Sequence, residues 1–189
     1  MVKKSLVIEI SKNDSALDDY LQIVSTDAAC VAKRYWKDPD LNSYNGGKIH
    51  PITLLSHANN KNFITDYNSG GYKTYQSGND VAKQIVSLGL IPTRFKFCLL
   101  AGCKGAESTG REGLYVQVGD ALVIPVVAST TPVKLATTNT QITLTPQDQG
   151  QWKVYFPEES SVYGLEHERC KEIHEYLMGY VFQCCTEES

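Results

Sequence analysis

Residues 95–108 read FKFCLLAGCKGAES, and this stretch decides the fold. The run from Phe95 to Ala101 is almost continuously apolar, which is typical of a β-strand covered on both faces of a sheet. Gly102 and Cys103 end the run, and the residues that follow are polar and contain glycine. In a mainly parallel sheet, functional side chains gather beyond the carboxyl ends of the strands. The sequence therefore predicts that Cys103 lies where an α/β protein carries its site.

The rest of the chain alternates strand and helix patterns. Strand patterns occur in three further segments: 5–10, 50–57 and 123–128. Apolar residues recur at helical spacing in three others: 15–36, 80–88 and 113–122. Ser15 and Asp18 form a weak capping box, and Pro125 predicts an edge or a bulge for the last strand. We therefore expect a mostly parallel sheet flanked by helices.

The C-terminal third has a different character. Residues 134–145 and 151–156 flank a turn and predict a β-hairpin, and residues 160–185 are helical in composition. The polar stretch 58–79 is rich in Asn and Gly, and it predicts a long functional or mobile loop. No repeat or domain boundary is visible. We expect a single α/β domain over 1–189, with 158–189 as a helical appendage.

Composition excludes several classes of function. The chain has 189 residues and a net charge of −3, and it has no Lys/Arg cluster, so nucleic acid and anionic membranes are not expected partners. No apolar run approaches the ~18 residues of a membrane span. Leu6–Ile10 is too short for a signal peptide and contains Glu9, so a cytoplasmic protein with free thiols is expected. Nothing in the sequence predicts a cofactor or a metal.

Two side chains at strand ends have the chemistry of a catalytic dyad. His57 closes the strand pattern ITLLSH, and Cys103 closes FKFCLLAGC. A thiol becomes a good nucleophile as a thiolate, and a histidine within reach takes its proton and later protonates the leaving amine. Gly102 permits a close approach of the backbone. The amides of Cys103 and Ala58 are the predicted oxyanion donors.

These two motifs resemble those of the caspase-like cysteine peptidases. In that family the histidine precedes the cysteine by about 50 residues, and here His57 precedes Cys103 by 46. LLSHAN and LLAGC are most similar to the self-cleaving cysteine protease domain of large bacterial toxins, and the similarity extends over roughly residues 45–157. The resemblance implies a caspase-like fold and a cysteine endopeptidase. It also implies that Gly102 and Ser129, Thr130 and Thr131 form the substrate-binding edge for an extended peptide.

Two differences from the toxin domains affect this expectation. Those domains have glycine after the histidine, where this chain has Ala58, and they bind inositol hexakisphosphate in a basic pocket. The matching hairpin here has only Lys134 and Lys153, so that activator is not expected. Another small-molecule or protein activator, the oligomeric state and the substrate stay open. The acidic C-terminus also resembles, in composition alone, the signals of bacterial effectors secreted into a host cell.

Other interpretations stay open beside this one. A catalytically inactive caspase-like domain would use the same groove to bind a peptide or partner. Arg111 follows Cys103 by eight residues, too far for the Cys-x5-Arg loop of cysteine phosphatases, and the turn from Gly102 to Gly105 is at most a weak phosphate site. One helical face would carry three zinc-type ligands: His167, Cys170 and His174. An amphipathic packing helix explains the same spacing.

Overall fold

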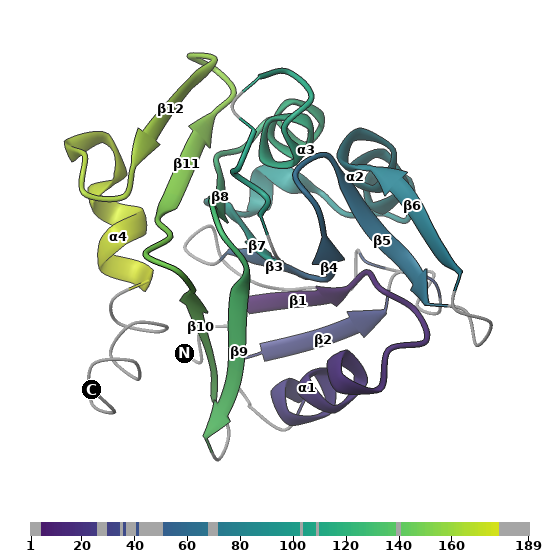
Figure 1. Ribbon diagram of the computed structural model, residues 1–189. Helices are drawn as coiled ribbons and strands as arrows, with labels where there is room; N and C mark the ends of the chain where they lie inside the picture. The colour runs from purple at the N-terminus through teal and green to yellow at the C-terminus, as the bar shows by residue number, and fades with distance from the viewer. Residues whose placement is uncertain are drawn as a thin grey trace.

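The computed structural model describes residues 5–25, 30–34, 36, 41, 51–67, 72–102, 104–108, 110–138 and 141–177. It is an α/β fold built on a seven-stranded sheet (Figure 1). Five strands are parallel: β1 (Ser5–Glu9), β2 (Cys30–Arg34), β3 (Ile52–Leu55), β7 (Cys98–Ala101) and β8 (Val126–Ser129). Two antiparallel strands complete the sheet: β11 (Trp152–Phe156) and β12 (Ser161–Gly164). The order is β12-β11-β8-β7-β3-β1-β2, which confirms the predicted fold class.

Helices cover both faces of this sheet. On one face, α2 (Gly78–Ser87) and α3 (Leu114–Leu122) pack on alternate strand residues such as Cys98 and Leu100. On the other face, α1 (Ser15–Ser25) and α4 (Lys171–Leu177) pack on the residues between them, such as Leu99. Both sides of β7 are therefore buried, which explains its continuous apolar run. Burial raises the pKa of the Cys98 thiol, so Cys98 is a packing group.

The predicted loop 58–79 is wrong over the described residues. They form a separate antiparallel sheet of β4 (His57–Ala58), β5 (Asn62–Tyr67) and β6 (Lys73–Ser77), in the order β4-β5-β6. Phe63 is fully buried in the core cluster that includes residues of α2. Burial of Phe63 stabilises the segment as a sheet. The many Asn and Gly residues around Phe63 make this strand pattern hard to recognise in the sequence.

Two predicted boundaries are also wrong. The helix predicted over 15–36 ends at Ser25, and β2 begins at Cys30, because Val31, which also fits the helical period, pairs with Leu6 of β1 instead. The predicted hairpin has different partners. β9 (Val133–Thr138) pairs with β10 (Gln141–Pro146), while β11 joins β8 in the main sheet.

Pro125 does not mark an edge strand or a bulge. It precedes β8, which lies inside the sheet, and its carbonyl accepts a hydrogen bond from the Cys98 amide at 2.8 Å. Because Pro125 precedes the first residue of β8, the N–H that proline lacks is not needed for any hydrogen bond between the strands.

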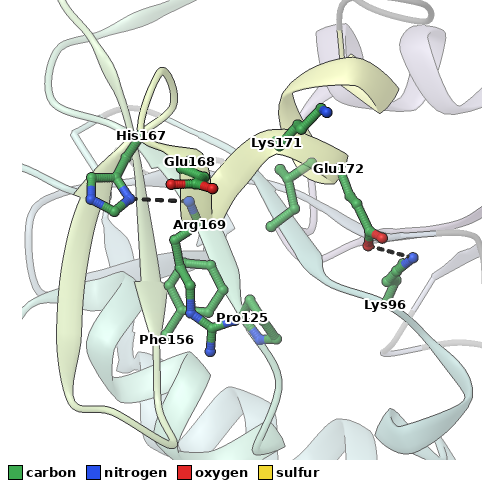
Figure 2. Close-up of a pocket in the computed structure, with 9 residues that line it drawn as sticks. Lys96, Pro125, Phe156, His167, Glu168, Arg169, Lys171 and Glu172 are labelled. Carbon is green, nitrogen blue, oxygen red and sulfur yellow. Dashed lines mark hydrogen bonds and ion pairs between the residues drawn. The ribbon is translucent and has the colours of Figure 1, made fainter.

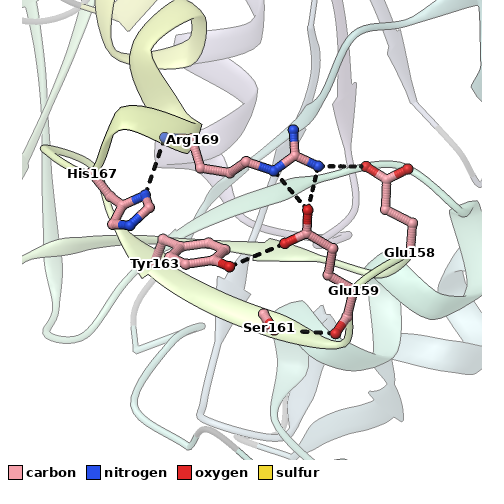
Figure 3. Close-up of polar contacts among 6 residues, drawn as sticks. All are labelled: Glu158, Glu159, Ser161, Tyr163, His167 and Arg169. Atoms are coloured by element: carbon pink, nitrogen blue, oxygen red, sulfur yellow. Dashed lines mark hydrogen bonds and ion pairs between the residues drawn. The ribbon is translucent and has the colours of Figure 1, made fainter.

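The C-terminal part is less helical than its composition predicts. Ser161–Gly164 is the edge strand β12, and a short 3-10 turn, η2 (Glu168–Cys170), leads into α4. Figure 3 shows how the turn before β12 is tied to η2: Arg169 Nε donates to Glu159 at 2.7 Å, and an Arg169 Nη donates to Glu158 at 3.2 Å. Tyr163 Oη donates to the second oxygen of Glu159 at 3.1 Å. These contacts are exposed, so they orient the turn more than they stabilise it.

Within the described residues, none of the helices has the length and apolar character needed to cross a membrane.

Candidate functional site

His57 lies where the strand order of the main sheet reverses. From β1 the chain continues to β2 on one side, and from β3 it continues to β7 on the other. Ligands of open parallel sheets bind outside the carboxyl ends of the strands at such a switch point. His57 follows β3, and Asp14 lies in the loop after β1, so both flank this point.

Asp14 and His57 are hydrogen-bonded. Asp14 Oδ2 lies 2.9 Å from His57 Nε2, and the side chains are 16% and 36% exposed. An ionised carboxylate can only accept, so Nε2 is the donor of this bond, and in a neutral imidazole Nδ1 is then the acceptor nitrogen. The other carboxylate oxygen of Asp14 accepts the Leu17 amide at 2.9 Å and caps the start of α1. The cap is therefore Asp14, and not the predicted Ser15–Asp18 box.

Two further contacts fix the histidine. Ser11 Oγ accepts the His57 amide at 2.8 Å and donates to the Ile64 carbonyl at 2.6 Å, so the buried serine joins β4 and β5. The Tyr67 ring meets the imidazole edge-on, with 5.0 Å between centroids. Ser11 thus binds the backbone of His57, Tyr67 contacts its ring, and Asp14 binds its Nε2. The Nδ1 side of the ring remains for chemistry.

Cys103, the predicted nucleophile, lies outside the described residues, but both of its neighbours are placed. A Cβ built on Gly102 would lie 2.9 Å from the Ser56 carbonyl oxygen and 3.5 Å from Ala58 Cβ. The Lys104 amide donates to the Thr131 carbonyl at 3.2 Å. The chain therefore leaves β7 against the His57 segment and continues beside the end of β8. Gly102 is required for this close approach, as the sequence predicted.

Backbone strain lies next to both halves of the site. Asn13 has φ 60° and precedes Asp14, while Lys104 has φ 58° and follows Cys103. Asparagine tolerates the left-handed conformation, whereas lysine there is uncommon. Such residues cost about 1–3 kcal/mol and gather at functional sites.

The ladder between β4 and β5 shows which way the Ala58 amide points. The Asn59 amide donates to the Asn62 carbonyl at 2.9 Å, and Ala58 pairs with Phe63 one position further along. Hydrogen-bonded and non-hydrogen-bonded pairs alternate in an antiparallel ladder, so the Ala58 N–H points away from β5. This geometry is compatible with the predicted role of Ala58.

The predicted substrate-binding residues already use their backbone groups within the fold. The Thr130 amide donates to the Gln151 carbonyl at 3.0 Å, and the Thr131 amide donates to Ser129 Oγ at 3.2 Å. The Ser129 carbonyl accepts the Ala106 amide at 2.9 Å, and Ser129 itself is fully buried between β7 and β11. Strand addition by a peptide at these three residues stays a prediction, and it would require some of these bonds to be exchanged.

A buried carboxyl lies under the same end of the sheet. Glu9, the last residue of β1, is fully buried, and its Oε2 lies 3.2 Å from Arg34 Nε. Burial raises its pKa to about 8; the nearby Asp18 carboxyl adds to the rise and Arg34 opposes it. Near neutral pH, Glu9 therefore holds its proton. Glu9 is not among the predicted site residues, although a glutamate within an apolar strand is a visible signal.

The three residues that left a zinc site open as an alternative do not converge. His167 Nδ1 accepts the Arg169 amide at 3.1 Å, Cys170 is buried in the core, and His174 lines a different hollow. Across the described ranges, no group of three His, Cys, Asp or Glu side chains could hold a metal ion. The amphipathic packing interpretation accounts for their spacing.

A cavity of about 580 Å³ lies beside η2 and α4, and Figure 2 shows residues that line it. Two of them, Lys96 and Pro125, precede β7 and β8, so the cavity is at the opposite end of the parallel strands from His57, which follows β3. Pro125, Phe156 and Ile173 line it together with charged side chains, among them Lys96 and Glu172, which are paired at 2.6 Å. Cations and carboxylates both surround it, so its charge favours neither anions nor cations. It contains no nucleophile–base pair, and the candidate chemistry stays at His57.

Asp14 and Ser11 are the site residues that sequence reasoning missed. An aspartate just before a helical pattern was visible as a cap, but only the fold shows that its second oxygen reaches His57. No protein-family model matches the chain, and no curated protein matches its sequence.

Proposed function

We propose that the chain is a cysteine peptidase of the caspase-like kind, with Cys103 as nucleophile, His57 as general base and acid, and Asp14 as the residue that orients His57. The observation that carries the proposal is the 2.9 Å bond between Asp14 and His57 at the switch point of the sheet. Gly102, the residue before the cysteine, packs against the same segment. A nucleophile, a base and a group that orients the base are the parts of a nucleophilic triad.

The roles follow from the hydrogen bonds. Asp14 accepts Nε2–H, so His57 Nδ1 takes the thiol proton from Cys103. The thiolate adds to the peptide carbonyl carbon, and the electron pair moves onto the carbonyl oxygen. His57 then returns the proton to the leaving amine as the C–N bond breaks. Water, deprotonated by the same nitrogen, hydrolyses the thioester and restores the thiol.

The oxyanion is stabilised by backbone donors. The Ala58 N–H points away from β5 and is one donor, and the Cys103 N–H is the second. A substrate carbonyl would lie between the end of β4 and the residues after β7. A peptide or protein is the substrate class, and a role as an effector in a host cell stays a prediction.

The test is selective labelling of Cys103. The purified protein is incubated with a peptidyl electrophile specific for cysteines, and the adduct is mapped by mass spectrometry. We expect Cys103 to react at least ten-fold faster than the other thiols, and His57→Ala to abolish the difference. Equal labelling of all exposed thiols would contradict the proposal and favour the binding-module interpretation.

Asp14→Asn separates orientation from folding. Asparagine caps a helix as well as aspartate does, so α1 stays capped. An amide beside Nε2 no longer favours the required tautomer, and we expect the labelling rate to fall by about 10²–10⁴-fold. Asp18→Asn in α1 is the matched control and should leave the rate unchanged. Equal rates for Asp14→Asn and Asp18→Asn would remove Asp14 from the mechanism.

A further inference from the structure

Within the part of the chain that the structure describes, the small sheet beside His57 ends in an open edge. β6 pairs with β5 on one side, and among the described residues no strand pairs with its other side. Figure 1 shows β6 as the outer strand, away from the main sheet. Open edges offer backbone donors and acceptors to an extended chain, and proteins usually protect them with charges, proline or bulges. The outer edge of β6 contains no proline, and Lys73 is its one charged side chain.

The register shows which groups of β5 face which neighbour. The Asn62 carbonyl accepts the Asn59 amide at 2.9 Å, and the Ile64 carbonyl accepts Ser11 Oγ at 2.6 Å. Both residues therefore direct their backbone groups toward β4. Phe63 lies between them, so its amide and carbonyl point the other way, toward β6.

The same alternation gives the outward groups of β6. Phe63 pairs with Gln76, so Gln76 bonds inward and Tyr75 directs its amide and carbonyl outward. The bulge in this pairing lies on β5, and β6 stays regular. Thr74 therefore faces inward and Lys73 outward. Two residues, Tyr75 and Lys73, present two N–H and two C=O groups to an added strand.

The side chains of these two residues lie on the face that carries His57. Paired residues share a face, which places His57, Ile64 and Tyr75 in one cross-strand row and Tyr67 and Lys73 in the next. Lys73 Nζ lies 5.5 Å from the centre of the Tyr67 ring, which in turn contacts His57. Tyr75 is 50% exposed. Aromatic side chains are enriched at interfaces, so the exposed Tyr75 ring can contribute to recognition of a bound chain.

We propose that the outer edge of β6 binds an extended segment of the peptide substrate by strand addition, outside the site of cleavage. This inference rests on the proposed peptidase function for the identity of the occupant. Side chains of an added strand that share the His57 face are two residues apart. An apolar or aromatic residue would lie opposite Tyr75, and an acidic residue would lie opposite Lys73. A strand added to β6 would lie three strand spacings from β4, about 14 Å, so the edge would hold substrate beside the scissile bond.

The test measures binding separately from cleavage. The Cys103→Ala protein is labelled with ¹⁵N and titrated with the blocked peptide Ser-Thr-Phe-Thr-Glu-Thr-Ser. We expect saturable changes in amide chemical shift centred on Lys73 and Tyr75. Two control peptides should bind at least ten-fold more weakly: one in which Lys replaces Glu, and one in which Phe and Glu are adjacent. Lys73→Glu should reverse the preference between the Glu and Lys peptides.

Lys73→Pro and Lys73→Ala form a matched pair. Both remove the cation, but only proline removes the outward N–H, and the ladder to β5 does not use that group. We expect both to fold, with binding weaker in Lys73→Pro than in Lys73→Ala.

Each result has one meaning. Absence of shifts at β6 up to 1 mM peptide, or equal binding of all peptides, would overturn the inference. Labelling of Cys103 in the unmodified protein is measured in parallel. Intact labelling without β6 binding refutes only the exosite. Specific β6 binding without labelling supports the edge as a peptide site and refutes the catalytic function.

Discussion

Replacing the buried Glu9 carboxyl with an amide should change how stability depends on pH. The pKa of Glu9 rises from 4.5 to about 8 in the folded protein, mainly because the side chain is removed from water and next because of Asp18. Between these values the unfolded chain loses the proton while the folded chain keeps it. The free energy of unfolding therefore falls as pH rises, by up to about 1.4 kcal/mol per pH unit, and is level again above pH 8.

The magnitude follows from the size of the shift. A difference between 4.5 and about 8 corresponds to on the order of 5 kcal/mol, which the protonated carboxyl contributes at low pH and loses as pH passes through 8. Glu9→Gln has no proton to lose. We expect it to match the native protein near pH 4.5 and to become progressively more stable than the native protein up to pH 8.

Urea unfolding followed by circular dichroism at one-unit intervals from pH 5 to 9 measures this difference. Asp18→Asn is the informative control, because removing the neighbouring carboxyl lowers the pKa of Glu9 and should end the decline at a lower pH. Parallel curves for the native protein and Glu9→Gln, separated by a constant free energy, would refute the reasoning.

Three further substitutions test particular features. Val123 is the C-cap residue of α3, with φ 57° and 71% exposure. Val123→Gly should therefore relieve backbone strain and raise the free energy of unfolding by about 1 kcal/mol, which corresponds to roughly 2–4 °C in melting temperature. An unchanged melting temperature would contradict this. The Tyr115 hydroxyl is buried without a hydrogen-bond partner among the described residues, and burial raises its pKa to about 12. Tyr115→Phe should therefore leave the free energy of unfolding in urea unchanged or raise it by about 1 kcal/mol. A lower free energy of unfolding would show that the hydroxyl makes a hydrogen bond. Gly102→Ala would bring a Cβ within 2.9 Å of the Ser56 carbonyl oxygen, so Cys103 labelling should slow at least ten-fold. Gly110→Ala, where nothing lies within 4 Å, should label normally, and equal rates for the two would show that the contact is unimportant.

The sequence was most informative where local pattern and tertiary environment agree. β7 is predictable from its continuous apolar run, and α2 and α3 are predictable from their apolar helical faces. In each case the residues that form the pattern are the residues that become buried. Residues 30–34 fit a helical period equally well, and only pairing with β1 makes them a strand. The β4-β5-β6 sheet was missed because its burial depends on few residues, chiefly Phe63.

The candidate site divides in the same way. Strand-end positions identify His57 and Cys103, since a residue after a buried strand is visible in one sequence. Asp14 is 43 residues from His57 in the chain, and no spacing rule links the two. Its contact exists because β1 and β3 are neighbours in the sheet. The open edge of β6 likewise appears only once the strand order is known.

The interior position of β8 has a consequence for biosynthesis. β8 (Val126–Ser129) pairs with β7 on one side through Val126 and Val127, but the strand that covers its other side, β11, ends only at Phe156. At about 5–20 residues per second, a ribosome needs roughly one to five seconds to extend the chain that far. During that interval the nascent chain carries an uncapped hydrophobic ladder. A translational pause between these two strands would prolong the exposure, and co-translational aggregation would be most sensitive to codon choice in this interval.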